Sequence, residues 1–259
     1  MVVIAGAGIA GSSLAREFAR HGIPVEVKAP NNGASTAALC LLRKAWMPHG
    51  PLREAVQEAV EQYYDLDAVV ATQAVWTNGD RPAELRNDWY LIDIRKLLVH
   101  PPGIWVPADT PLPVVWAIGA HAGGAVTWGV TYRSTTAELL TPGNTNAWVH
   151  QIRPYRQVSA VRVNGEVRVG SSVADTLDKA CFEAERLLEV ARRRNMVRGE
   201  DWEPVIGKRL SSGLSPSLNL YSLDSKGGGK VGGFGRSGFS FAPTVARLFV
   251  QDWLRNQGG

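Results

Sequence analysis

Three glycines near the start of the chain have the spacing of a turn that binds the diphosphate of a dinucleotide. Gly6, Gly8 and Gly11 form the pattern Gly-x-Gly-x-x-Gly. In such a turn the first glycine permits a tight bend, the second lets the backbone approach the pyrophosphate, and the third lets a helix pack closely on a strand. Ile9 and Ala10 lie at the start of that helix and add backbone N–H donors. The pattern therefore predicts dinucleotide binding.

The residues around this turn predict the elements that position it. Residues 2–5 are apolar and typical of a buried parallel strand, and residues 9–20 follow with a helical pattern. Gly22 supplies a C-cap for this helix, and residues 25–27 predict a second strand. A strand, a glycine turn, a helix and a second strand are the parts of a Rossmann-like unit.

One expected part of this unit is absent. An Asp or Glu about 18 to 20 residues after the last glycine normally binds the ribose hydroxyls. That place falls on Ala29, with Lys28 before it, whereas Glu26 lies inside the predicted strand, where alternation points it elsewhere. A basic residue here is also compatible with NADP, whose 2′-phosphate favours a cation. The identity of the dinucleotide therefore depends on the rest of the chain.

The composition limits the classes of protein to which the chain can belong. Its 259 residues are 45% hydrophobic and 20% charged, enough to bury one large domain or two interleaved ones. The two cysteines and five histidines show no disulfide framework and no metal-ligand spacing, so we expect no metal site. No apolar run reaches about 18 residues, and Met1 leads directly into the first predicted strand. We therefore expect a cytoplasmic protein without a membrane span or a signal peptide.

The charge of the chain is compatible with two kinds of surface. A formal net charge of +4 and a pI near 9.2 fit either a basic solvated surface or contacts with the phosphates of a nucleotide or a nucleic acid. The densest basic cluster consists of residues 192–194 and Arg198. It ends a helix predicted from about residue 173 to residue 194, where cations also complement the helix dipole.

A second glycine-rich turn lies in residues 231–254. A strand-like approach passes through this turn into a helical pattern, and Pro243 suits the first turn of that helix. The turn can bring another set of N–H donors to the same ligand. With this pair of turns, the chain resembles the FAD-dependent D-amino-acid oxidase superfamily, and most closely its glycine oxidase and sarcosine oxidase branch. The resemblance implies that the C-terminal helix points its N-terminus at the pyrimidine edge of the flavin.

Four further segments carry the resemblance. They are similar to a small-residue segment along the FAD, an Asp-x-x-x-Leu-Leu helix, an apolar strand ending in a glycine turn, and the strands of a substrate domain. In that order they are residues 33–46, 90–100, 114–122 and 155–173, the last with a hairpin signal at Asn164-Gly165.

The resemblance implies an α/β fold with a Rossmann-like FAD-binding domain, interleaved with a smaller α+β antiparallel-sheet substrate domain. We expect the FAD-binding domain to consist of residues 1–45, 88–122 and 205–259. Residues 46–87 and 123–204 then form the substrate domain.

The resemblance also assigns residues to the cofactor. It implies FAD that is held noncovalently by the first glycine turn and by small residues of the later segments. These later residues are Ser35, Thr36, Ala37, Gly119, Gly235, Gly238, Phe239 and Ser240.

Two arginines are candidates for binding a substrate carboxylate, because a planar guanidinium forms paired parallel hydrogen bonds with it. Arg209 matches the arginine of a Gly-x-Arg-Pro segment of the family, although Leu210 replaces the proline. Arg236 lies two residues before Gly238, at the family's second arginine position. The resemblance implies that both arginines hold the substrate, whereas the alternative for each is a surface salt bridge.

Three functions stay open at this point. The first is FAD-dependent oxidation of the C–N bond of glycine or an N-substituted glycine, which gives an imine and then glyoxylate and an amine. The second is the same chemistry on DNA carrying glycine-modified thymidine, as in phage DNA hypermodification, and the compact chain, its pI and its nine tryptophans suit it. The third is a non-catalytic dinucleotide-binding protein or an NAD(P) enzyme, favoured by the missing acid at Ala29.

Overall fold

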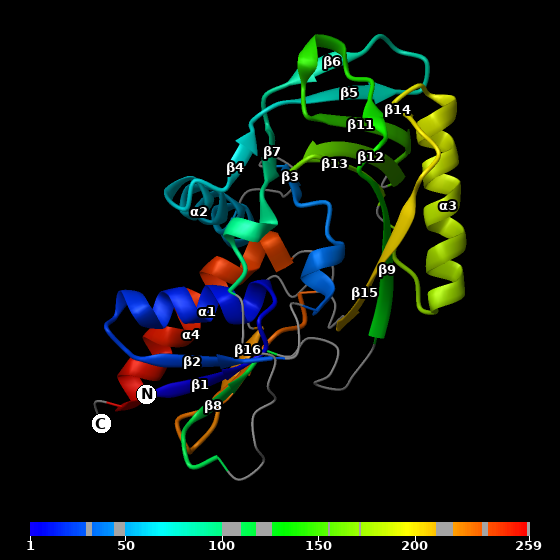
Figure 1. Cartoon of the computed structure of the whole chain (residues 1–259). Helices are drawn as coiled ribbons and strands as arrows, with labels where there is room; N and C mark the ends of the chain where they lie inside the picture. Colours follow the sequence, from blue (N-terminus) through cyan, green and yellow to red (C-terminus); the bar gives the residue numbers. More distant parts are fainter. Residues whose placement is uncertain are drawn as a thin grey trace.

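The structure is a computed structural model that describes residues 1–29, 33–43, 50–99, 110–117, 126–154, 156–170, 172–210, 220–234 and 238–257. Two large sheets dominate this part of the chain, one of five strands and one of seven. Figure 1 shows them at opposite ends of the molecule, with β1 and β8 in one and β5 and β11 in the other.

The five-stranded sheet contains the first glycine turn. Its order is β16-β17-β8-β1-β2, and β1 pairs in parallel with both β2 and β8. All four residues of β1 are buried, as expected for a parallel strand covered on both faces. The strands are β1 (Val2–Ala5), β2 (Val25–Lys28), β8 (Val114–Trp116), β16 (Tyr221–Leu223) and β17 (Gly229–Val231).

Helices α1 (Ile9–Arg20) and α4 (Gly238–Gln257) pack on this sheet, and α2 (Pro51–Asp65) lies beyond them. The ring of Phe18 on α1 packs edge-on against Phe249 and Trp253 of α4, with centroid distances of 6.2 and 5.3 Å. Helix α2 packs against the other part of α4. By their bounds, β1, α1 and β2 form where the sequence predicts the first strand, the first helix and the second strand.

The seven-stranded sheet has the order β15-β9-β13-β12-β11-β5-β6 and is antiparallel except for the pair β11–β5. Helix α3 (Leu177–Arg193) covers one face, and its Leu187 and Leu188 pack against apolar residues of β12 and β13 (Figure 1). Asn164 and Gly165 have φ values of 56° and 78° and form the predicted hairpin turn. The strands are β5 (Ala74–Asn78), β6 (Glu84–Arg86), β9 (Val126–Ser134), β11 (Ala147–Arg153), β12 (Arg156–Val163), β13 (Glu166–Gly170) and β15 (Glu203–Leu210).

Two small sheets and three short 3-10 helices complete the described elements. The sheets contain β3 (Leu41–Arg43), β4 (Val69–Ala71) and β7 (Trp89–Ile92), and β10 (Glu138–Leu139) with β14 (Val197–Arg198). The 3-10 helices are η1 (Gly33–Ala37), η2 (Ile94–Lys96) and η4 (Pro142–Asn144). The Asp-x-x-x-Leu-Leu segment forms only the short η2, whose N-cap Asp93 accepts a hydrogen bond from Arg95 N.

The two large sheets are built from segments that alternate along the chain, so the predicted interleaving is confirmed. Two elements cross the predicted boundaries. Helix α2 lies in the range expected for the substrate domain but packs on α4, and β15 extends into the range expected for the FAD-binding domain but is an edge strand of the seven-stranded sheet. The division of the chain into an FAD-binding and a substrate domain stays a prediction.

Two negative findings apply to the described ranges. Their helices include none with both the length and the apolar character needed to cross a membrane. Within the same ranges, no group of three or more His, Cys, Asp or Glu side chains is placed to hold a metal ion.

The start of α4 differs from the sequence prediction. The helix begins at Gly238, so Pro243 is its sixth residue and lies inside the helix rather than in its first turn. Proline has no backbone N–H, and the carbonyl oxygen of Phe239, four residues earlier, therefore lacks its helical donor. The hydroxyl of Tyr63 on α2 donates to this oxygen instead, at 2.7 Å. A distant side chain thus makes the interior proline tolerable.

A half-buried carboxylate also joins α2 to α4. Glu58 accepts hydrogen bonds from Thr244 Oγ1 at 2.8 Å and from Arg247 Nε and Nη2 at 2.8 and 3.0 Å. Burial alone would raise the pKa of Glu58, but the hydrogen bonds from Arg247, Thr244 and Gln62 outweigh it and lower the pKa below its ordinary value of 4.5.

We expect Glu58→Gln to destabilise the protein near neutral pH by about 1–2 kcal/mol, because the pair is partly exposed. A depressed carboxyl pKa contributes stability above the ordinary value of 4.5, and this contribution is lost as the pH falls through the folded-state pKa. Urea unfolding across this range should therefore show the native protein and Glu58→Gln converging in acid. Glu54→Gln, an exposed change on the same helix, is the control. A gap that stays constant with pH would contradict the prediction.

Candidate dinucleotide-binding and active site

The first glycine turn lies where the strand order of the five-stranded sheet reverses. Strand β1 has parallel neighbours on both sides, and ligands of open α/β sheets bind at the carboxyl end of such a strand. Gly6 follows β1 with a φ of 121°, in the left-handed region that favours glycine. Gly8 is the N-cap of α1, and no side chain caps it.

The third glycine of the turn is fixed by close packing of helix on strand. A Cβ atom on Gly11 would lie 1.8 Å from the carbonyl oxygen of Gly6 and 2.8 Å from its carbonyl carbon. Both are backbone atoms, which cannot move aside as the end of a flexible side chain can. The structure therefore shows the role that the sequence predicts for Gly11, which is to let the helix pack closely on the strand and its turn.

The first turn of α1 offers hydrogen-bond donors that the described residues leave free. Ser12 N makes the first bond within the helix, to Gly8 O at 2.9 Å, and Ile9 N donates to Ser35 Oγ at 2.9 Å. The N–H groups of Ala10 and Gly11 have no partner in the described ranges, although both residues are buried. The first turn also has no acidic residue. Unpaired buried donors at a positive helix end fit a diphosphate.

The end of β2 differs from a usual ribose site. Ala29 is buried, with 1% of its surface exposed, and offers no carboxylate. Lys28 Nζ forms an ion pair with Glu26 Oε2 at 3.2 Å, and Glu26 is the more exposed of the two. The positive charge of Lys28 is therefore partly neutralised, which weakens the case for a 2′-phosphate at this place.

The short helix η1 connects the glycine turn to the seven-stranded sheet. Ser35 contacts Ile9 N, as described above, and the buried Thr131 Oγ1 of β9 donates to Ala37 O at 2.7 Å. Arg168 Nη1 of β13 donates to Thr36 O and Ala38 O at 3.1 and 3.2 Å. Figure 1 shows η1, in blue, beside β9 and β15. The segment with Ser35, Thr36 and Ala37 thus lies between the first glycine turn and the seven-stranded sheet.

We expect Thr131→Val to loosen η1. The change keeps the side-chain shape but leaves the carbonyl oxygen of Ala37 without its donor, at a cost of about 1–3 kcal/mol in the free energy of unfolding. The affinity for FAD should fall as well, because η1 also contacts Ile9. Urea unfolding and FAD titration measure both effects, with the exposed Thr136→Val as control. If the two variants have equal free energies of unfolding and equal affinities for FAD, the contact between Thr131 and Ala37 does not position η1.

The two helix N-termini meet. Gly238, the first residue of α4, is so close to Ile9 of α1 that a Cβ on it would lie 3.0 Å from Ile9 Cγ2. Phe239 and Ser240 follow with 7% and 4% of their surface exposed, and Phe239 shares an apolar cluster with Ile9 and Cys40. The glycine turns at the two ends of the chain therefore lead into adjacent helix starts, as the sequence suggests.

The structure places only the backbone of one candidate arginine. Arg209 pairs with Thr127 of β9, and Val205, four residues earlier on β15, pairs with Thr131. This backbone pairing places the end of β15 beside β9, the strand whose Thr131 contacts η1. The side chain of Arg209, and all of Arg236, Gly119 and Gly235, lie outside what the structure describes. Their roles stay predictions.

Sequence reasoning missed three residues that support this site: Tyr63, Thr131 and Arg168. Each acts on a backbone carbonyl far away in the chain, on Phe239, Ala37 and the η1 segment respectively. A tyrosine within a helical pattern and an alternating strand residue give no local signal of such a partner. Pro243 could have given such a signal, because an interior proline requires a substitute donor, but the sequence placed it in the first turn of its helix.

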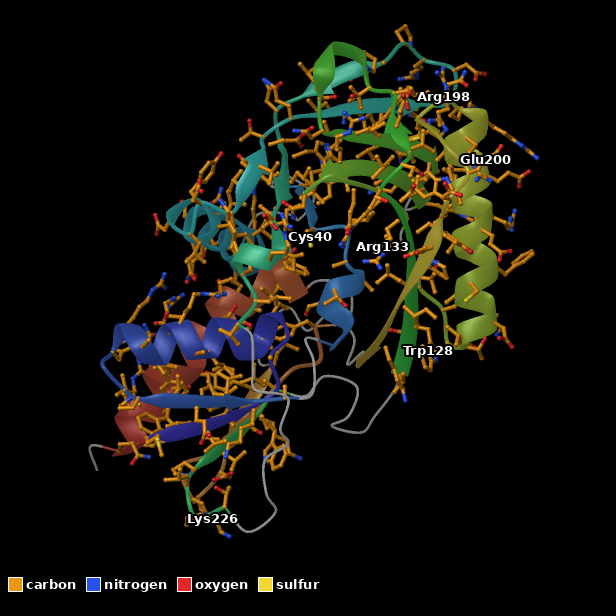
Figure 2. The ribbon with its side chains drawn as sticks, in the orientation of Figure 1. Cys40, Trp128, Arg133, Arg198, Glu200 and Lys226 are labelled. Carbon is orange, nitrogen blue, oxygen red and sulfur yellow. The ribbon has the colours of Figure 1, made fainter. Side chains whose placement is uncertain are left out.

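An open hollow of about 660 Å³ lies elsewhere on the molecule, near the end of α3. Arg198 and Glu200, which line it, lie at the upper right of Figure 2, away from Cys40 and from Lys226 in the turn between β16 and β17. The hollow is therefore not part of the candidate site. Its lining consists of Leu140, Arg192, Asn195, Val197, Arg198, Gly199 and Glu200.

Comparison with known proteins identifies the fold. No family model and no curated protein matches the chain. Among solved structures, glycine oxidase from Geobacillus kaustophilus is similar with a TM-score of 0.69 and 14% identity, over 98% of this chain and 94% of that one. Iminodiacetate oxidase from Chelativorans sp. BNC1 gives 0.65 and 17%, over 96% and 94%. An FAD-dependent oxidoreductase from Pseudomonas aeruginosa gives 0.62 and 15%, over 99% and 90%.

These similarities cover nearly the whole of each chain, so the chain has the complete fold of these oxidoreductases. The predicted α/β fold, with a Rossmann-like unit joined to an antiparallel sheet, is confirmed.

Proposed function

We propose that the protein is an FAD-dependent oxidoreductase that cleaves the C–N bond of glycine or an N-substituted glycine. The observation that carries the proposal is the meeting of two helix N-termini, Gly238 against Ile9, beside the unpaired N–H groups of Ala10 and Gly11. The fold supports it, because glycine oxidase and iminodiacetate oxidase share this fold along nearly their full length.

The chain's own residues would divide the work as follows. The N–H groups of Ala10 and Gly11 bind the diphosphate, and Ser35 keeps η1 at the turn. Arg209 and Arg236 hold the substrate carboxylate with paired hydrogen bonds. Bound FAD supplies the acceptor for the hydride that leaves the carbon beside the amine. Loss of that hydride and of the N–H proton gives an imine, which water hydrolyses to glyoxylate and the free amine.

The modified-DNA substrate keeps the same chemistry and is the second candidate. The observation that bears on it concerns the basic cluster of residues 192–194 and Arg198, in which most guanidinium groups already have carboxylate partners. The ion pairs are Arg193–Glu189, Arg194–Asp80 and Arg198–Glu138. Much of the positive charge offered to a phosphate backbone is thereby balanced, which favours the small substrate.

Anaerobic mixing of the FAD-loaded protein with candidate substrates tests the proposal. We expect glycine, sarcosine or iminodiacetate to bleach the flavin and to yield glyoxylate. Bleaching only by an oligonucleotide carrying glycine-modified thymidine, with a rate that falls steeply as salt is raised, would decide for the DNA substrate. A flavin that none of these compounds reduces would contradict both.

A further inference from the structure

The first turn of α4 depends on a donor from another helix. In an α-helix the N–H of residue 243 would bond to the carbonyl oxygen of residue 239, and Pro243 lacks that N–H. The Phe239 oxygen is therefore open at a place where its residue is buried. An unpaired buried carbonyl is costly. The 2.7 Å hydrogen bond from Tyr63 Oη fills this position.

The surroundings of Tyr63 keep its hydroxyl available as a donor. Tyr63 is fully buried, with 0% of its surface exposed. Burial raises the pKa of Tyr63, so the hydroxyl stays protonated across the physiological pH range. Its ring packs in the apolar cluster that also contains Ile9 and Phe239. The same tyrosine therefore contacts the cluster shared by both helix starts.

The second turn of α4 is fixed from the same side. Glu58 of α2 accepts hydrogen bonds from Thr244, in the second turn of α4, and from Arg247, in the turn after it. With Tyr63 on Phe239, α2 thus controls both the first and the second turn of α4. Because Gly238 packs on Ile9, a shift of the first turn would be transmitted to the start of α1.

We propose that Tyr63 is a positioning residue for the cofactor, because its hydroxyl replaces the N–H that Pro243 lacks and so keeps the first turn of α4 aligned at the dinucleotide site. This inference rests on the proposed FAD-dependent function. Tyr63 is fully buried, so its effect on the cofactor is indirect. It acts through the direction of the N–H groups at the start of α4.

A rescue experiment separates this role from general packing. Tyr63→Phe removes only the hydroxyl, and we expect it to raise the Kd for FAD about tenfold to a hundredfold and to shift the visible absorption band of the bound flavin. Pro243→Ala supplies the missing N–H from within the helix. The double variant Tyr63→Phe/Pro243→Ala should therefore return to within about threefold of the native Kd and regain the native spectrum.

Two controls complete the set. Tyr64→Phe makes the same change at the neighbouring residue, which is 50% exposed, and should bind FAD like the native protein. Pro243→Ala alone should also bind normally, because the Phe239 oxygen can accept from both donors. Urea unfolding of the same proteins without added FAD should show a lower free energy of unfolding for Tyr63→Phe and its recovery in the double variant.

The outcomes distinguish the inference from the function on which it rests. Native protein that binds no FAD would overturn both. If native protein binds FAD and Tyr63→Phe binds it equally well with an unchanged spectrum, the positioning role is wrong and the function stands. A weakened Tyr63→Phe that Pro243→Ala does not rescue, in FAD binding or in unfolding, would show that the hydroxyl does not replace the missing N–H, and would also overturn the inference.

Discussion

Gly11→Ala should abolish the binding of FAD. The new Cβ would lie 1.8 Å from Gly6 O, whereas real Cβ atoms essentially never come within 3.0 Å of an atom outside their own residue and its chain neighbours. Helix α1 would therefore have to move away from Gly6 by more than an ångström. Such overpacking costs about 1–3 kcal/mol in stability. The same movement takes the N–H groups of Ala10 and Gly11 away from the diphosphate, and losing two hydrogen bonds to a charged group raises the Kd by at least about a hundredfold.

The matched control for this prediction is Ser13→Ala on the same helix. Ser13 is buried, and its hydroxyl has no hydrogen-bond partner in the described ranges, so its removal should leave the Kd for FAD almost unchanged. Fluorescence titration of FAD with the three proteins measures the effect. Normal FAD binding by Gly11→Ala would mean that the first glycine turn does not hold the cofactor.

Arg236→Ala should impair substrate oxidation while leaving FAD binding intact. Removal of one partner of a buried, hydrogen-bonded charge pair costs about 2–5 kcal/mol, which is roughly a thirtyfold to several-thousandfold loss. Arg236→Lys keeps the charge but loses the planar fork, so it should be impaired as well. The same reasoning applies to Arg209. FAD content should hardly change, because the glycine turn holds the diphosphate.

Stopped-flow reduction of the bound flavin by glycine and sarcosine measures this effect apart from cofactor binding. Arg193→Ala is the control, because the Arg193 side chain is 74% exposed and lies on α3, in the basic cluster away from the site. A reduction rate for Arg236→Ala equal to that of the control would remove the carboxylate-binding role from the account.

The local elements of the dinucleotide-binding unit could be predicted because their signals are local. The buried run at residues 2–5 and the glycines at fixed offsets each report on a few neighbouring residues. Gly22 does end the first helix, although it follows the C-cap residue His21, with a φ of 70°. The Asn164-Gly165 hairpin was predictable for the same reason, since its turn requires positive φ at both positions.

The contacts that hold the site together could not be predicted in this way. Thr131 and Ala37 are 94 residues apart, and Tyr63 and Phe239 are 176 residues apart. No periodicity encodes such a pairing, because it depends on how two sheets and three helices pack. Pro243 shows the limit clearly: its preference for a first turn predicted a later helix start, and a tertiary hydrogen bond overrode that preference.

The visible absorption spectrum of the purified protein, before and after denaturation, tests the central claim most directly. We expect a yellow protein with the two visible bands of an oxidised flavin, and the release of intact FAD when the protein is unfolded. A colourless protein that takes up no FAD and binds NADP(H) instead would contradict it.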